Sequence, residues 1–185
     1  MKLLLLGLIF LIFSCNGLKP KRDKQILDFG LFTIETPSGW QKIQQKGIDS
    51  YIGEIAIDET DTLGFDLGGF SNRLNEYDPI ILDSSMIRSV DSSILTYAIF
   101  VKDRRVVDPD KYRKNNIFWH TVDGRKAKIV IPIKSGLGTT GIYIDSLWET
   151  RSSIDNFCLY GENLKPNNQN LVLEAILTLK FKKGK

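Results

Sequence analysis

The sequence predicts an α+β domain in which an antiparallel β-sheet is flanked by a C-terminal helix and short helices. Two features predict this class: short apolar segments separated by turn-forming residues, and one broadly amphipathic segment near the C-terminus. The composition, with 42% hydrophobic and 25% charged residues, is that of an ordinary globular protein. A chain of 185 residues is long enough to bury a sizeable core in one domain.

Several segments have the pattern of β-strands, at residues 32–35, 51–57, 63–67, 94–101, 126–131, 140–147 and 156–160. Pro37 stops the first segment, and the polar residues 58–62 join the second and third as a hairpin. Residues 94–101 are apolar on both faces, which predicts a central strand. In the segment that follows, Lys126 and Lys128 alternate with apolar residues, so both lysines are expected on a solvated face.

One convincing helix is predicted near the C-terminus. Asn168 follows Pro166 and is expected to cap the helix N-terminus. Polar residues fall four apart on one stripe, at Asn170, Glu174, Thr178 and Lys182. The residues between them are apolar, so the helix is expected to lie across the sheet. Short helices are expected at residues 84–90 and 109–114.

The N-terminus has the pattern of an export signal. Lys2 provides a positive charge, residues 3–13 form an uncharged apolar run, and Ser14 and Cys15 follow. The run is shorter than the roughly 20 residues that a helix needs to cross a bilayer. The segment resembles the signal peptide of bacterial lipoproteins, which implies removal of residues 1–14 and acylation of Cys15. An uncleaved anchor and ordinary secretion are the alternatives.

The resemblance to lipoprotein signals divides the chain into a signal peptide (1–14), a lipidated tether (15–27) and one β-rich globular domain (28–185). Asn16 stands where inner-membrane lipoproteins of enterobacteria carry Asp, so the periplasmic face of the outer membrane is the expected location. The membrane, reached through the lipid on Cys15, is one expected partner. The formal net charge of +3 gives no reason to expect nucleic acid as another.

A second resemblance concerns the domain itself. Residues 32–40, with the sequence FTIETPSGW, resemble the F-x-I-x-x-P-x-G-W opening of PsbP-like proteins, and residues 171–181 resemble their closing helix. The resemblance implies an antiparallel sandwich flanked by helices. It also implies a non-enzymatic binding or assembly factor, because PsbP-like domains mostly act in that way. The chain is also similar to uncharacterised Bacteroidota lipoproteins. The ligand is left open between a protein and a small molecule.

A glycine-rich stretch is the first candidate for a ligand or partner surface. Gly136, Gly138 and Gly141 satisfy the G-x-G-x-x-G pattern of dinucleotide-binding loops. A strand-like segment follows in place of the required helix, so a glycine-rich hairpin is expected, with no cofactor. Because loops often carry binding sites, we expect the surface to combine these glycines with Trp148.

Aromatic residues are the second group of candidates for a recognition surface. They are Trp40, Trp119, Trp148, Tyr51, Tyr143 and Tyr160. Large aromatic side chains can anchor partners when they are exposed. In a domain of this size, packing in the core or at a sheet edge is the expected role for most of them.

His120 is the single histidine of the chain. Strand alternation places it on one face with Phe118 and Val122, so a packed or hydrogen-bonded core histidine is expected. A hydrolase with His120 as its base is an alternative that requires a nearby serine and carboxylate. The carboxylates considered are Asp123, Asp145 and Glu149. A periplasmic inhibitor or immunity-type protein is a further alternative.

Cysteine usage excludes several kinds of site. With Cys15 assigned to lipid, Cys158 stands alone in an apolar segment, which predicts a buried thiol and no disulfide. One histidine and one cysteine cannot form a Cys/His zinc site, so no metal is expected. Asp58, Glu59 and Asp61 lack the spacing of a calcium-binding EF-hand loop and are expected at a hairpin tip.

Overall fold

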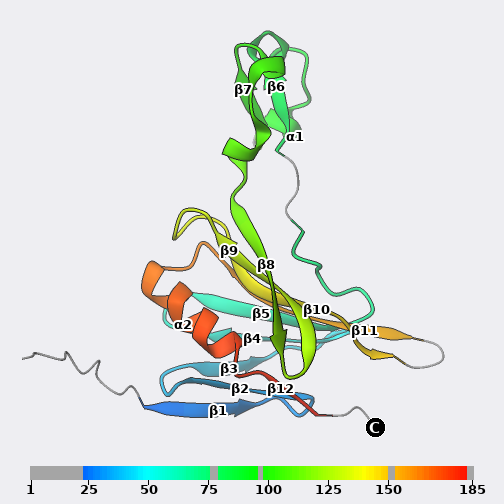
Figure 1. Ribbon diagram of the computed structural model, residues 1–185, viewed down its shortest axis with the longest axis vertical. Helices are drawn as coiled ribbons and strands as arrows, with labels where there is room; N and C mark the ends of the chain where they lie inside the picture. The colour runs from blue at the N-terminus through cyan, green and yellow to red at the C-terminus, as the bar shows by residue number, and fades with distance from the viewer. Residues whose placement is uncertain (1–22, 76–78, 96–97, 150–152, 183–185) are drawn as a thin grey trace, which may run out of the picture.

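The computed structural model describes residues 23–75, 79–95, 98–149 and 153–182. Within these ranges the protein is a mostly antiparallel β fold with few helices (Figure 1). The predictions about the signal peptide and Cys15 lie outside the described residues. Among the helices that are described, none combines the length and the apolar character needed to cross a membrane.

The larger sheet has seven strands, all paired antiparallel, in the order β3-β4-β5-β11-β10-β9-β8. In that order the strands are Gln41–Gln44, Tyr51–Ala56, Thr62–Gly68, Ile154–Glu162, Thr139–Glu149, Arg125–Pro132 and Asn115–Val122. Ala56 pairs with Thr62 across the β4–β5 turn, so the predicted hairpin is confirmed. The predicted aspartate-rich hairpin tip is also confirmed at this turn.

A smaller sheet of three strands contains β1 (Lys24–Asp28), β2 (Phe32–Pro37) and β12 (Lys180–Phe181). β1 pairs with β2 along its whole length, and β12 pairs with the start of β2. The predicted tether ran to residue 27, whereas β1 already begins at Lys24. The folded sheet therefore includes the last four residues of the predicted tether.

The core lies between the two sheets, and phenylalanine side chains fill its centre. Phe32 of β2 is fully buried, and its ring centroid lies 5.0 Å from those of Phe65 on β5 and Phe157 on β11. Phe29 stacks on Phe32 at 4.8 Å. Edge-to-face and stacked rings at these distances add to the stabilisation from burial alone. β2 thus joins both sheets through one aromatic side chain.

The C-terminal helix α2 (Pro166–Ile176) packs against β2 and β10, which confirms that a helix forms there. Its predicted extent is wrong, because the helix ends before Thr178 and Lys182 and the chain turns back as β12. Its predicted N-cap is wrong. Lys165 occupies the cap position without a side-chain cap, while Asn168 lies inside the helix. Asp61 of the β4–β5 turn accepts hydrogen bonds from Lys165 N and Asn168 Nδ2, both at 2.8 Å. A carboxylate distant in sequence therefore does the work expected of a local cap.

Residues 79–95 and 98–114 form a projection that we call the knob. It contains β6 (Ile81–Asp83), α1 (Ser92–Leu95), β7 (Ile99–Val101) and 3-10 helices at Ser84–Met86, Arg104–Val106 and Pro109–Tyr112. The predicted central strand at residues 94–101 is therefore wrong. β7 pairs in parallel with β6, away from the main sheet. An apolar run of this length does not distinguish a helix from a buried strand.

The knob and β1 lie at opposite ends of the molecule. Figure 1 shows β6, β7 and α1 above the seven-stranded sheet, with β1, β2 and β12 below it. β8 runs from the base of the knob into the seven-stranded sheet. The described chain begins at β1, so the N-terminal segment enters at the end far from the knob.

Candidate functional site

The glycine-rich stretch forms the turn between β9 and β10, as a glycine-rich hairpin should. Gly136 and Gly138 have φ angles of +85° and +128°, which other residues adopt with strain. Gly141 lies within β10, where an added Cβ would come within 2.6 Å of the Leu159 carbonyl oxygen. Strand β10, not a helix, follows the turn. The glycines therefore serve the turn and the close packing of β10 against β11.

Trp148 lies near the other end of β10, opposite Asp155. At about 3.3 Å per residue, it is on the order of 20 Å along the strand from Gly141. The side chain is half-buried against the core, and its Nε1 has no hydrogen-bond partner within the described residues. The structure thus does not bring Trp148 together with the glycine turn into one surface.

The two lysines predicted on a solvated face have different environments. Lys126 is exposed, and its Nζ lies 4.5 Å from the centroid of the Trp119 ring. Lys128 is buried, which makes the prediction wrong for this residue. Its Nζ donates to Asn75 Oδ1 at 2.9 Å because the segment after β5 crosses this face of the sheet. Burial, with a smaller contribution from Arg73, lowers the pKa of the Lys128 ammonium.

Cys158 lies near Lys128 on the same face of the sheet. The thiol is fully buried with Leu74, Val130 and Tyr143, as predicted. Burial raises the pKa of this thiol, so the reactive thiolate is disfavoured at neutral pH. These contacts are those of a packed cysteine, and they give no sign of a nucleophile.

His120 is exposed on β8, so the predicted core histidine is wrong. The alternation itself holds, because Val122 on the same face is buried in the core. The sheet simply extends beyond the core at this edge, which leaves His120 and Phe118 uncovered. No residue in the described part of the chain hydrogen-bonds to the His120 side chain. Within those residues, no hydrogen bond links His120 to a serine or a carboxylate, the contacts that a catalytic triad uses.

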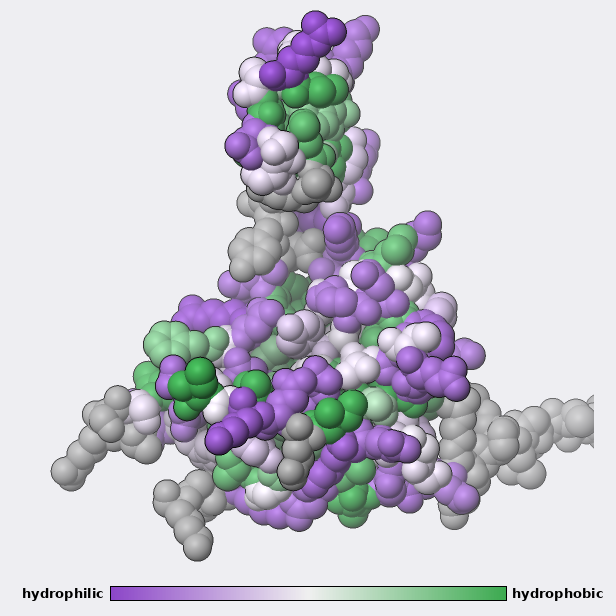
Figure 2. Space-filling model, turned by 180° about the vertical axis from the view of Figure 1, so that it is seen from behind, coloured by the Kyte–Doolittle hydropathy of each residue, from purple (hydrophilic) through white to green (hydrophobic). Residues whose placement is uncertain are grey.

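The knob is the most unusual surface of the protein. None of its residues, in the ranges 79–95 and 98–114, is buried. Ile80, Ile87 and Leu95 are exposed, and 82% of the Val106 surface is accessible. Figure 2 shows apolar side chains gathered on the knob in the view from behind. The knob therefore presents apolar surface without a core of its own.

Charged residues surround these apolar side chains. The knob contains five aspartates and seven lysines or arginines. Several are paired within the knob: Arg104 with Asp83, Arg105 with Asp103, and Arg113 with Asp110. Ion pairs as exposed as these contribute little to stability. The mixed charge gives no single sign that would select nucleic acid or an acidic polymer.

No protein-family model and no curated protein matches this chain. The surfaces described above are therefore the basis for assigning a function. Within the described residues, no group of three or more histidine, cysteine, aspartate or glutamate side chains is arranged to hold a metal ion.

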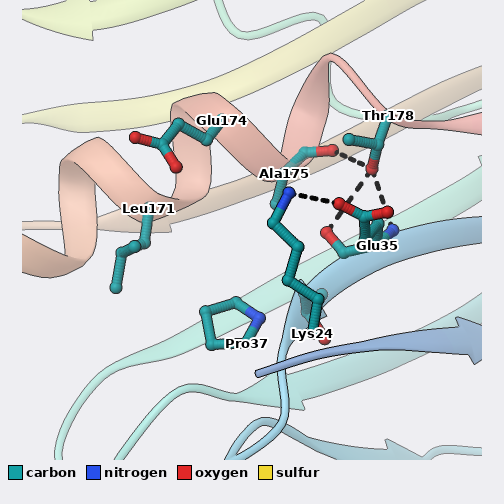
Figure 3. A pocket seen from close by; sticks show the side chains of 8 residues that line it. Lys24, Glu35, Pro37, Leu171, Glu174, Ala175 and Thr178 are labelled. Carbon is teal, nitrogen blue, oxygen red and sulfur yellow. Dashed lines mark hydrogen bonds and ion pairs between the residues drawn. The ribbon is translucent and has the colours of Figure 1, made fainter. Parts of the chain in front are cut away.

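A small cavity of about 50 Å³ lies between β2 and α2 (Figure 3). Glu35 and Glu174 stand at its rim, and Lys24 forms an ion pair with Glu35. Thr178 Oγ1 accepts a hydrogen bond from Glu35 N at 2.8 Å, which ties the segment after α2 to β2. A volume of this size holds one or two water molecules. The cavity is too small for an organic ligand.

No pattern in the sequence marks the knob as a surface, and the sequence predicts that most aromatic residues are packed. Trp40 is indeed buried, whereas Phe118 and Trp119 are exposed. One signal was available in the sequence: residues 115–122 carry no charged side chain apart from the titratable His120. An apolar, uncharged strand can be a core strand or an uncovered edge, and only the topology distinguishes the two.

Proposed function

We propose that this protein is a lipid-anchored, non-enzymatic binding or assembly factor at the periplasmic face of the outer membrane. The N-terminal pattern of Lys2, an apolar run and Cys15 supports the anchor. Two or three acyl chains on Cys15 would hold the domain at the membrane almost permanently, at about 0.8 kcal/mol per buried methylene. Two facing sheets with a C-terminal helix support assignment to the α+β, PsbP-like class.

The observation that carries the binding role is the knob. The knob buries none of its described residues, so its apolar side chains do not serve a core of its own. The exposed ones are Ile80, Ile87, Leu95 and Val106. Contiguous exposed apolar surface on a folded domain marks an interaction site. The partner that fits is a protein, because side chains of mixed charge surround the apolar ones.

The position of the knob suits a tethered protein. The N-terminal segment enters at β1, and the knob lies at the far end of the long axis (Figure 1). An acylated Cys15 would therefore hold the β1 end at the membrane and direct the knob into the periplasm. On this proposal, the protein presents a binding element at a distance from the lipid surface.

Site-specific photo-crosslinking in living cells tests the binding role. We expect p-benzoylphenylalanine at Val106 to give a discrete protein adduct, and the same residue at Ile26, 69% exposed on β1, to give none. Cys15→Ser should move the protein out of the membrane fraction. Absence of an adduct at Val106, or the same adduct at both positions, would contradict the proposal.

A further inference from the structure

The two main sheets have four edge strands, and they differ in how they discourage pairing. β1 carries Lys24 and Asp28, β3 is four residues long and carries Lys42, and β12 is two residues long and carries Lys180. Short length and lysine are the usual devices that keep an edge from pairing with another chain. Three of the four edges are therefore protected.

β8 has none of these devices. It is eight residues long, with the sequence NNIFWHTV, and contains no lysine, arginine, acidic residue or proline. In the described part of the chain, no strand lies beyond β8 in the sheet order. The side chains in the middle of β8 are uncovered on both faces of the sheet: Phe118 is 52% exposed on the core-facing side, and Trp119 is 59% exposed on the other. A long, apolar, uncharged edge of this kind is a template for a further strand.

We propose that β8 pairs antiparallel with β8 of a second copy of this chain, across a two-fold axis at Phe118. The two seven-stranded sheets then form one continuous sheet. Such an axis is perpendicular to the sheet, so the core-facing sides of the two copies lie on the same side of the combined sheet. Each side chain therefore lies beside a side chain of the other copy that belongs to the same face. Two-fold symmetric pairing of this kind is the commonest form of association between identical chains.

The side chains of β8 fit this register. Phe118 lies opposite itself, Ile117 lies opposite Trp119, and Asn116 lies opposite His120. Aromatic pairs and pairs of aromatic with β-branched residues are the favourable cross-strand combinations. Asn116 can hydrogen-bond to either state of the His120 ring. A register centred on Trp119 would instead place Phe118 against His120 and Ile117 against Thr121, so it matches polar with apolar residues.

The absence of charge argues for a second copy as the occupant. A charged residue on the axis would face its own copy, whereas β8 has no Lys, Arg, Asp or Glu on the axis or elsewhere. In this register residues 115–121 of the two copies face one another, so seven of the eight residues of β8 lie opposite a residue of β8. The inference does not depend on what the knob binds, because the residues that face one another, 115–121, follow the knob in the chain.

Cysteine cross-linking in membranes from cells that produce the full-length chain tests this register. In Phe118→Cys, the two thiols lie next to the axis, where directly opposite Cβ atoms are about 5 Å apart. Mild oxidation should give a band at twice the monomer mass. Thr121→Cys is the matched control on the same strand. Its two copies lie six residues apart across the axis, about 20 Å, and should not cross-link.

The wild-type chain sets the background from Cys15 and Cys158. We expect Trp119→Lys, added to Phe118→Cys, to reduce the dimer at least fivefold, because it puts a charge on the strand. An unchanged melting temperature would show that the variants fold. Equal cross-linking at positions 118 and 121, or none at 118, would overturn the proposal. An adduct of Phe118→Cys with a different protein would also overturn it and would assign β8 to a partner strand.

Discussion

At the residue scale, two neighbouring residues with positive φ build the turn between β8 and β9. Asp123 has φ +49° and Gly124 has φ +75°, the backbone pattern of a two-residue hairpin turn. Asp123 Oδ2 also accepts hydrogen bonds from Phe181 N at 2.9 Å and from the Arg125 guanidinium at 3.0 Å. The turn therefore sets the β8–β9 register and holds β12 in place.

We expect Gly124→Ala to destabilise the protein by about 1–2 kcal/mol, because an alanine at this φ brings its Cβ against the backbone. Gly39→Ala is the matched control. Gly39 lacks a positive φ, and nothing lies within 4 Å of an added Cβ, so its effect should stay within about 0.5 kcal/mol. Urea unfolding followed by circular dichroism measures both. Equal effects would show that the turn conformation is not limiting.

At the scale of elements, the β4–β5 turn orders the start of α2. Asp61 is buried, and its carboxylate accepts from Lys165 N and Asn168 Nδ2. Asp58 accepts from Asn168 Nδ2 at 2.7 Å and forms an ion pair with Lys165. Two aspartates from one hairpin thus hold the first turn of a helix more than a hundred residues later.

Asp61→Ala should lower the free energy of unfolding by about 1–3 kcal/mol, since it leaves the Lys165 N–H without its acceptor. Glu59→Ala changes an exposed carboxylate in the same turn and should have little effect. Thermal unfolding of the two variants beside the wild type gives the comparison. A loss in Glu59→Ala as large as that in Asp61→Ala would point to the turn itself and not to the cap.

The same contacts make the attachment of α2 depend on pH. Backbone hydrogen bonds from Thr60 and Asp61, followed by those from Asn168 and Lys165, hold the pKa of Asp58 well below its usual range. A carboxylate with a depressed pKa contributes its stability above the pKa of the unfolded state, and that contribution is lost as the pH falls through the folded pKa. The attachment of α2 is therefore weakened only under strongly acidic conditions.

At the scale of the whole molecule, one core supports both sheets and α2, while the knob stands outside it. The core contains fully buried residues from β2, β5, β10 and β11. The knob has a parallel pair of three-residue strands with no buried residue in its described ranges. Regions with few buried apolar contacts open at a lower free energy than the core.

Hydrogen exchange should separate the two regions. Amides of β6 and β7 are expected to exchange at least about 100-fold faster than those of β5 and β11, because opening the knob exposes no buried core. Peptide-level mass spectrometry gives the rates. Slowing of the knob amides when a partner is added would accompany the proposed binding. Protection in the free knob equal to that in β11 would show that the knob is an integral part of the fold.

Local patterns in the sequence determined much of the fold. The β4–β5 hairpin, the β2 strand before Pro37, the glycine-rich turn, the buried Cys158 and the existence of α2 are all confirmed. Each depends on interactions between residues close in the chain or on simple alternation. The N-terminal pattern ending at Cys15 stays a prediction, because it lies outside the described residues.

The tertiary structure alone decided which apolar and polar residues are covered. Lys128 is buried because the segment after β5 crosses it, and His120 is exposed because the sheet extends past the core. Residues 94–101 lie in the knob region, not in the centre of the sheet, and Asp61 replaces the expected cap of α2. Alternation tells which face a side chain lies on, but what covers that face depends on segments distant in sequence. That covering is what distinguishes a core strand from an open edge such as β8.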